Sequence, residues 1–258
     1  MGKRLDLFLT EKCNIDSRTK AQKLIKEGFV LVNGKNVLKS SVEVFDEDIV
    51  EIVEHDDYVS RGAYKLIGAI EKFNLNFNNK IVLDVGASTG GFTQVSLKNG
   101  AKKVYALDVG EGQLDKKIKT DKRVVDLSKT DIRVVEKEKI KDVDIIIGDL
   151  SFISLTKVLP RINEMFGNEK EIVFLFKPQF ECGKDIAKKY RGIIKNKQIH
   201  KNLLKNFENF AKILKFSLSN MTFSPIKGGD GNIEYLVYLN GKNESYDIEQ
   251  LVEEAFRT

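Results

Sequence analysis

The sequence has little cysteine, little histidine and no long run of apolar residues. The two cysteines, Cys13 and Cys182, lie far apart in the chain, so we expect free thiols rather than a disulfide framework. The two histidines, His55 and His200, fall in an expected linker and an expected helix without metal-ligand neighbours, so no metal site is expected. No stretch approaches about 18 uninterrupted apolar residues, which argues against a membrane span and stable membrane association.

The beginning of the chain also lacks the apolar core of a signal peptide, because residues 1–6 read Met-Gly-Lys-Arg-Leu-Asp. We therefore expect a cytoplasmic protein. With 258 residues, of which 41% are hydrophobic and 31% charged, the chain has the composition of a soluble globular protein with one large and one small domain. The expected domains are 1–57 and 58–258. A net charge of +5 suits a polyanionic partner.

A strand that runs into small residues is the strongest chemical signal in the chain. Residues 81–85 read Ile-Val-Leu-Asp-Val, and the turn that follows contains Gly86, Gly90 and Gly91. Glycines permit positive φ and let the backbone approach a ligand, while the next helix, expected at 92–99, points its first amides at it. The turn is therefore expected to bind a nucleotide.

A second strand, expected at 103–108, ends in Asp108, where an acid suits a ribose diol. The glycine spacing differs from the dinucleotide pattern and resembles motif I of S-adenosylmethionine-dependent methyltransferases, D-x-G-x-x-x-G-G. The resemblance implies S-adenosylmethionine rather than a nicotinamide or flavin. The expected cofactor-binding residues are Asp84, Gly86, Ala87, Ser88, Thr89, Gly90, Gly91, Phe92, Asp108, Asp131 and Asp149.

Strands and helices alternate from residue 58 onward. Strands are expected at 81–85, 103–108, 144–149, 172–177, 217–224 and 234–239, and helices at 92–99, 155–166 and 198–215. This alternation predicts an α/β domain with a mostly parallel sheet covered by helices on both faces. Together with the motif I resemblance, it implies a Rossmann-like methyltransferase fold with a seven-stranded sheet. Ligands of such sheets bind at the carboxyl ends of the strands.

The first part of the chain has a different pattern and predicts a small α+β domain. Residues 1–42 carry nine basic and four acidic residues, whereas residues 43–57 carry eight acids and no base. A helix over 18–27, capped by Asp16 or Ser17, has an exposed basic face. An Asn33-Gly34 turn then predicts a hairpin, and alternating apolar residues predict a strand over 48–53.

This segment resembles the α-L RNA-binding domain shared by a ribosomal protein and pseudouridine synthases. The matching pattern is Ser17-Arg18-x2-Ala21-x2-Leu24-Ile25-x2-Gly28-x-Val30-x-Val32-Asn33-Gly34 and Asp48-x-Val50-Glu51-Ile52. The resemblance implies an RNA partner, although a solvated helix face on an adaptor domain would carry the same charges. The expected RNA-binding residues are Arg4, Arg18, Lys20, Lys23, Lys26, Lys35 and Arg61.

Three charged residues stand where expected strands end or begin: Asp149, Lys177 and Glu234. Singly, each would be interpreted as a solvated loop residue. Lys65, at the start of an expected helix, completes the set. Together they resemble the Lys-Asp-Lys-Glu tetrad of FtsJ-type RNA 2′-O-methyltransferases, which implies that these four are catalytic. With the α-L segment, residues 3–240 resemble the TlyA family, named as hemolysins and known as ribosomal RNA 2′-O-ribose methyltransferases. The chain departs from the family pattern at 189–196.

The resemblance implies methylation of a ribose 2′-hydroxyl in ribosomal RNA or ribosomal subunits. Lys177 would act there either as a base or as a cation that stabilises a developing alkoxide. Cys182 is expected to be inert, and Phe152 to be a packing residue with stacking on substrate as the alternative. The competing functions are a non-catalytic RNA-binding assembly factor and a membrane-active hemolysin. A mean hydropathy of −0.27, with no expected secretion signal or long apolar helix, disfavours the hemolysin.

Overall fold

The computed structural model describes residues 2–26, 28–52, 58–241 and 246–257. The chain divides into two compact units, one comprising residues 1–61 with 229–231 and the other residues 62–228 with 232–258. The expected boundary between residues 57 and 58 lies at the edge of residues 53–57, which are outside the described part, and it stays a prediction. His55 is outside the described residues as well.

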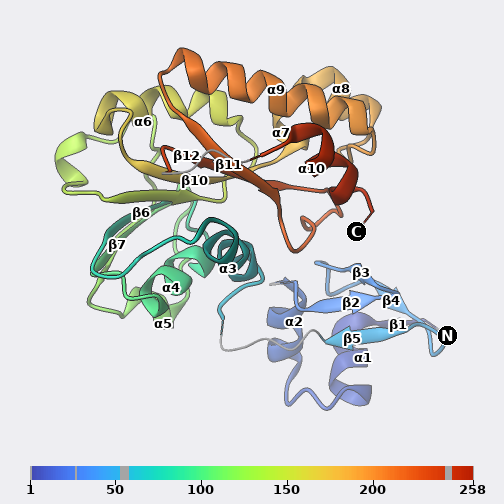
Figure 1. The fold of residues 1–258 in the computed structure, drawn as a ribbon. Helices are drawn as coiled ribbons and strands as arrows, with labels where there is room; N and C mark the ends of the chain where they lie inside the picture. The colour runs from blue at the N-terminus through green and yellow to red at the C-terminus, as the bar shows by residue number, and fades with distance from the viewer. Residues whose placement is uncertain (1, 27, 53–57, 242–245, 258) are drawn as a thin grey trace. The chain divides into compact units, whose positions relative to one another are not determined.

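The larger unit is built on a seven-stranded sheet with the order β11-β12-β10-β9-β6-β7-β8 (Figure 1). β12 runs antiparallel to the strands on both sides of it, and the remaining neighbours pair in parallel. This confirms the expected α/β fold class. The strands are β6 (Ile81–Val85), β7 (Lys103–Leu107), β8 (Val124–Leu127), β9 (Ile145–Gly148), β10 (Glu171–Phe176), β11 (Leu218–Phe223) and β12 (Tyr235–Leu239).

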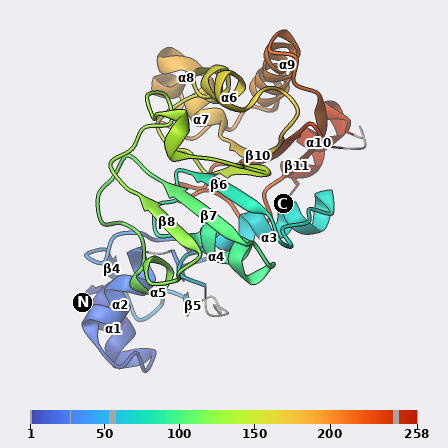
Figure 2. The same ribbon diagram turned by 90° about the vertical axis from the view of Figure 1, so that its left-hand side faces the viewer.

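Helices cover both faces of this sheet (Figures 1 and 2). α3, α4 and α5 lie on one face and α6 and α9 on the other, while α10 packs against α9 and β11. The helices are α3 (Gly62–Phe73), α4 (Gly91–Lys98), α5 (Lys116–Lys119), α6 (Leu159–Phe166), α7 (Pro178–Glu181), α8 (Gly183–Lys189), α9 (Lys197–Ile213) and α10 (Ile248–Ala255), with short 3₁₀ turns η1 (Lys137–Lys139) and η2 (Leu155–Lys157).

The central strands are apolar on both sides because both faces of the sheet are covered. Phe174 and Phe176 of β10, for example, are fully buried in a core that Leu204 and Phe207 of α9 complete. Burying a side chain of this size stabilises the fold by roughly 1.5–3 kcal/mol. The sheet therefore holds the carboxyl ends of its parallel strands at fixed positions.

The sheet has the expected seven strands, but the sequence analysis did not locate one of them. β8 (Val124–Leu127) pairs with β7 at the edge of the sheet, and all four of its residues are only half-buried. An edge strand this short and this exposed lacks the buried apolar run that identified the other strands. The helix expected at 155–166 also divides into η2 and α6.

The smaller unit combines two helices with two small sheets. α1 (Leu5–Lys12) was not expected, whereas α2 (Arg18–Lys26) was, and the Ser17 hydroxyl accepts a hydrogen bond from Lys20 N at 3.2 Å as its cap. Asn33 and Gly34 have φ of +52° and +71°, as a tight hairpin turn requires. The strands are β1 (Lys3–Arg4), β2 (Val30–Val32), β3 (Lys35–Asn36), β4 (Glu43–Val44) and β5 (Val50–Ile52).

Candidate active site

The four residues of the expected tetrad come from four separate elements and meet at one edge of the sheet. Asp149 and Lys177 follow the parallel strands β9 and β10 directly. Glu234 precedes β12, and because β12 is antiparallel its start lies at the same edge, where Tyr235 pairs with Phe176. Lys65 lies in the first turn of α3. The fold thus brings together residues up to 169 positions apart in the chain.

The tetrad forms a continuous series of alternating charges. Lys65 Nζ lies 2.8 Å from Glu234 Oε2 and 3.1 Å from Asp149 Oδ2, and Lys177 Nζ lies 2.6 Å from Asp149 Oδ1. Lys65, Lys177 and Glu234 are less than 10% exposed. Each buried charge is therefore compensated by an opposite one, as burial of ionised groups requires.

The ion pairs set the protonation of the tetrad. Burial alone would raise the pKa of Asp149, but the ammonium groups of Lys65 and Lys177 outweigh it and lower that pKa to about 2. Burial likewise disfavours the charged form of Lys65, and the carboxylates of Asp149 and Glu234 reverse this and raise its pKa. Asp149 is thus an anion, and Lys65 a cation, at neutral pH.

Two neighbours of the tetrad were not among the expected site residues. The Ser151 hydroxyl accepts a hydrogen bond from Lys177 Nζ at 2.9 Å, and Gln179 Nε2 donates to Glu234 Oε1 at 3.1 Å. Both belong to the segments Gly-Asp-Leu-Ser-Phe and Phe-Lys-Pro-Gln that carry the tetrad. The only feature of the sequence that could have pointed to Ser151 and Gln179 as site residues was their position, two residues after Asp149 and Lys177 respectively.

A cleft of 540 Å³ opens next to Asp149. Five of the expected cofactor-binding residues line it: Gly86, Ser88, Asp108, Asp131 and Asp149. Six do not line it: Asp84, Ala87, Thr89, Gly90, Gly91 and Phe92. The sequence did not indicate most of the side chains that complete the wall, among them Gln113, Ile132, Arg133, Leu150, Ile153 and Lys157.

The glycine turn is shaped to leave room at this cleft. Gly86 has φ of +84°, and a β-carbon on it would come within 3.0 Å of the Asp149 carbonyl oxygen. Gly90 has φ of +93°, and a β-carbon there would meet Leu114 and Ile118. Both positions therefore need glycine. The close approach of the turn to Asp149, which directly follows β9, fits a nucleotide-like ligand lying across the ends of β6 and β9.

The acids near the turn have different roles. Asp108 accepts hydrogen bonds from Ser88 N at 2.8 Å and Gly110 N at 2.7 Å, which holds the turn against the end of β7. Asp131 accepts from Arg133 Nε at 3.0 Å at the cleft wall. Asp84 lies behind the turn, completely buried, and accepts from Thr93 Oγ1 of α4 at 2.6 Å.

Asp84 is the most perturbed acid of the described residues outside the tetrad. Its burial raises its pKa to about 7, and only the hydrogen bonds from Thr93 oppose this. Its second oxygen, Oδ1, is buried without a hydrogen-bond partner in the described structure. Asp84 thus joins β6 to α4 beneath the turn and does not line the cleft.

Phe152 lies at the mouth of the cleft and is 90% exposed. The expectation of a packing residue is therefore wrong, because the ring contacts Phe180 of α7 at 5.1 Å between centroids instead of entering the core. Its backbone has φ of +64°, a conformation that bulky residues rarely adopt. The Phe180 ring in turn lies 5.8 Å from Lys177 Nζ. An exposed aromatic surface thus adjoins the tetrad.

Cys182 lies just beyond α7 and is buried, and burial raises the pKa of its thiol. A buried, protonated thiol is a poor nucleophile, in agreement with the expectation that Cys182 is inert. Among the described residues there is no group of three or more histidine, cysteine, aspartate or glutamate side chains arranged to hold a metal ion.

The expected RNA-binding residues of the smaller unit differ in their surroundings. Arg4 and Arg18 both pair with Asp6, which is fully buried, and their hydrogen bonds hold the pKa of Asp6 well below its usual range. Lys20 pairs with Asp16 at 2.6 Å. Arg61 donates to the Gly28 carbonyl at the end of α2.

The other expected RNA contacts of this unit are lysines. Lys26 and Lys35 are exposed. The side chain of Lys23 is outside the described part of the structure.

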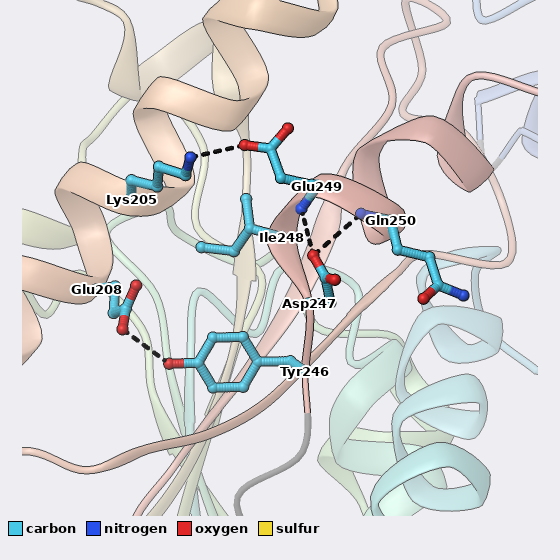
Figure 3. A pocket seen from close by; sticks show the side chains of 7 residues that line it. All are labelled: Lys205, Glu208, Tyr246, Asp247, Ile248, Glu249 and Gln250. Atoms are coloured by element: carbon cyan, nitrogen blue, oxygen red, sulfur yellow. Dashed lines mark hydrogen bonds and ion pairs between the residues drawn. The ribbon is translucent and has the colours of Figure 1, made fainter.

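A second hollow, of 820 Å³, lies between α9 and α10 and contains none of the expected site residues (Figure 3). Its polar groups are occupied by one another: Lys205 pairs with Glu249 and Tyr246 Oη donates to Glu208. Asp247 caps α10 through Glu249 N and Gln250 N. The polar side chains that line this hollow therefore link α9 to α10 and the residues before it at the surface. Across the described ranges, no helix combines the length and apolarity needed to cross a bilayer.

Comparison with known proteins places these features in a family. The FtsJ-like methyltransferase family matches residues 58–241, and the S4 domain matches residues 3–50. The chain is 43% identical over 240 residues to "Hemolysin A" of Brachyspira hyodysenteriae, covering 91% of this chain and 98% of that one. It is 37% identical over 253 residues to "23S rRNA (cytidine-2'-O)-methyltransferase TlyA" of Campylobacter jejuni. This match also covers 91% of this chain and 98% of that one.

A solved structure titled "Putative hemolysin from Streptococcus thermophilus" superposes with a TM-score of 0.77 at 35% identity. The match covers 99% of this chain and 96% of that one. These matches confirm the expected likeness to TlyA and hemolysin A proteins. The chain therefore belongs to the FtsJ-like methyltransferase family, with an S4 domain ahead of its methyltransferase domain.

Proposed function

We propose that this protein acts in the cytoplasm and transfers a methyl group from S-adenosylmethionine to a ribose 2′-hydroxyl of ribosomal RNA. The observation that carries the proposal is the series Glu234, Lys65, Asp149 and Lys177, in which each charge contacts an opposite one beside the cleft and only Asp149 is half-buried instead of buried. The name of the Campylobacter relative, a 23S rRNA 2′-O-methyltransferase, supports the same reaction.

The cleft suits S-adenosylmethionine. The Gly86 turn would carry its methionine and ribose portions, Asp108 would accept from the ribose diol, and Asp131 and Ile132 would border the base. When bound, the cofactor supplies a methyl group on a sulfonium. Calorimetry tests this assignment: Asp108→Ala should weaken S-adenosylmethionine binding, and Asp121→Ala, which removes an Arg123 partner elsewhere, should not. Equal heats for Asp108→Ala and wild type would refute the assignment.

Lys177 is proposed to act on the 2′-hydroxyl, which is a very weak acid. Its Nζ either accepts the hydroxyl proton or, as an ammonium, stabilises the developing alkoxide. Asp149 and Ser151 fix the position of Nζ through contacts of 2.6 and 2.9 Å. Glu234 holds Lys65, and Lys65 holds Asp149, which in turn orients Lys177. The series thereby aligns the acceptor oxygen with the cleft.

Phe152 and Phe180 are proposed to contact the base of the target nucleotide. An RNA base that is turned out of its helix exposes a π-face, and aromatic side chains stack on such faces. Phe152 is exposed, contacts Phe180 and borders both the cleft and the tetrad region. A stacked base would keep its own ribose next to Lys177.

Single-turnover transfer of labelled methyl from S-adenosylmethionine to ribosomal subunits, followed by nuclease digestion, tests the proposed function. A product nucleoside methylated on the 2′-oxygen is expected. A product methylated on the base, or RNA binding without any transfer, would refute it. The second of these outcomes would support the non-catalytic assembly factor.

A further inference from the structure

A strongly basic segment follows α7 and plays no part in the tetrad or the cleft. Residues 183–195, comprising α8 and the loop after it, contain five cations and a single acid, Asp185. The cations are Lys184, Lys188, Lys189, Arg191 and Lys195, and all five are exposed. We call this segment the basic loop. α7 and α8 follow one another directly after β10 (Figure 1), so the basic loop begins only a few residues beyond Lys177.

The cations of the basic loop differ from those of the next helix. Lys197, Lys201 and Lys205 of α9 each pair with Glu249 or Glu253 of α10 at 2.6 to 3.0 Å. The five cations of the basic loop have no carboxylate partner within the part of the chain that the structure describes. A surface on which positive side chains have no carboxylate partner attracts a polyanion.

The backbone of the basic loop places an arginine where a glycine is usual. α8 ends in a Schellman motif, in which Gly192 N donates to Ala187 O at 2.8 Å and Arg191 N donates to Lys188 O at 3.1 Å. Arg191 occupies the left-handed position with φ of +50°. The helix dipole favours cations in the last turn of α8, but it gives no reason for a strained arginine beyond that turn. The arginine side chain is exposed at this position.

Buried side chains fix the basic loop from beneath. Asn232, 2% exposed, accepts from Ile194 N at 3.0 Å and donates to Gly192 O at 2.8 Å. His200, completely buried, is 2.9 Å from Ile194 O through Nε2 and 2.7 Å from Tyr235 Oη through Nδ1. Asn232 stands two residues before Glu234 in the chain. The unpaired cations are thus held at a fixed place near the tetrad instead of on a loose loop.

We propose that the basic loop is an RNA-binding surface of the methyltransferase unit, which binds backbone phosphates of the strand that carries the target nucleotide. Arg191 suits this role because a guanidinium binds phosphate through two parallel hydrogen bonds. A rigid phosphate contact close to the tetrad would fix the register of the RNA and leave selection of the base to other groups. The proposal rests on the proposed function, because it takes RNA as the substrate.

The test is the triple variant Lys188→Gln, Arg191→Gln and Lys195→Gln in the full-length protein. Its control is Lys137→Gln, Lys139→Gln and Lys141→Gln, which removes the same charge from exposed residues. These residues precede β9 and so lie on the side of its amino end, whereas the tetrad lies at the carboxyl ends of the parallel strands. Affinity for a ribosomal RNA fragment is measured against salt concentration for both. Because each lost phosphate contact removes about 0.7 to 0.9 from the log-log slope, the basic-loop variant should lower the slope by about 2 and the control should leave it unchanged.

A single substitution distinguishes a loss of RNA binding that is due to a lost charge from one that is due to a less stable fold. Arg191→Gly relieves the left-handed strain, so thermal stability should be equal or higher while RNA binding weakens. In methyl transfer, the basic-loop variant should raise KM for RNA by at least about tenfold, because the loss of even one of its charge-assisted contacts has about that effect, with little change in kcat. Equal slopes and equal KM for the basic-loop variant and the control would overturn the proposal. Binding does not require turnover, so absence of methyl transfer in the wild type would refute the proposed function separately.

Discussion

The carboxylate of Asp149 lies 2.6 Å from the ammonium group of Lys177. The same carboxylate contacts Lys65 through its other oxygen, so one anion fixes two lysines in the same site. Since the pKa of Asp149 is lowered to about 2, this carboxylate stays an anion over the whole physiological range of pH. The position of Lys177 is therefore set by the protein before any substrate arrives.

Replacing Lys177 tests its role. Lys177→Ala should lower single-turnover methyl transfer by about 10²- to 10⁴-fold, the scale of one base or one electrostatic donor, while S-adenosylmethionine binding stays near that of the wild type. Lys177→Arg keeps the charge but cannot act as a base, so partial activity would favour alkoxide stabilisation. Lys72→Ala, at the exposed end of α3, is the control. Full activity of Lys177→Ala would contradict the proposed mechanism.

The pKa of Asp84 predicts a pH dependence of stability. Burial raises this pKa to about 7 in the folded state, whereas an unfolded aspartate has the ordinary value of about 3.9. Between these values the folded state binds more protons, so stability should fall as pH rises from about 4 to 7, by up to about 1.4 kcal/mol per unit, and level off above.

The matched variant for this prediction is Asp84→Asn, which has nearly the same shape and no titration. Its free energy of unfolding by urea, measured at pH 5, 6, 7 and 8, should lack the part of the slope due to Asp84. The variant should thus gain stability relative to wild type as pH rises. A difference that is constant across this range would show that Asp84 does not titrate as predicted.

The S4 domain should contribute phosphate contacts. Lys20, Lys26 and Lys35 replaced together by glutamine should weaken ribosomal RNA binding and lower the salt slope by about 2. The three acids of the exposed segment at Glu43, Asp46 and Glu47 give a control on the same domain, since their replacement by glutamine should leave the slope equal or higher. An unchanged slope for the lysine variant would indicate that this face binds something other than RNA.

Phe152 should matter for substrate and not for stability. Phe152→Ala should lower kcat/KM for RNA by about 10- to 100-fold, since stacking on one base contributes roughly 1–3 kcal/mol. Its melting temperature should match that of the wild type because the side chain is 90% exposed. Phe152→Tyr should retain most activity, and Ile213→Ala, at a residue 78% exposed on α9, should retain all of it. A wild-type kcat/KM for Phe152→Ala would exclude stacking.

The sequence by itself determined the local features of this protein. The apolar strand before Gly86 and the glycine turn follow from branched side chains and positive φ, which neighbouring residues decide. The Asn33-Gly34 hairpin turn is equally local. The strand ends that carry Asp149 and Lys177 were also predicted. A strand that is buried on both faces is an uninterrupted run of apolar residues, so the first charged residue after the run marks the end of the strand.

Only the tertiary structure decided how these features meet. The contact between Lys65 and Glu234 spans 169 positions and depends on the register of the antiparallel β12, which no local pattern contains. The exposure of Phe152 depends on what packs beside it, and so does the burial of Asn232 beneath the basic loop. The burial of a side chain, its pKa and its ion pairs depend on neighbours from other helices and strands. These neighbours come together only when the sheet has formed.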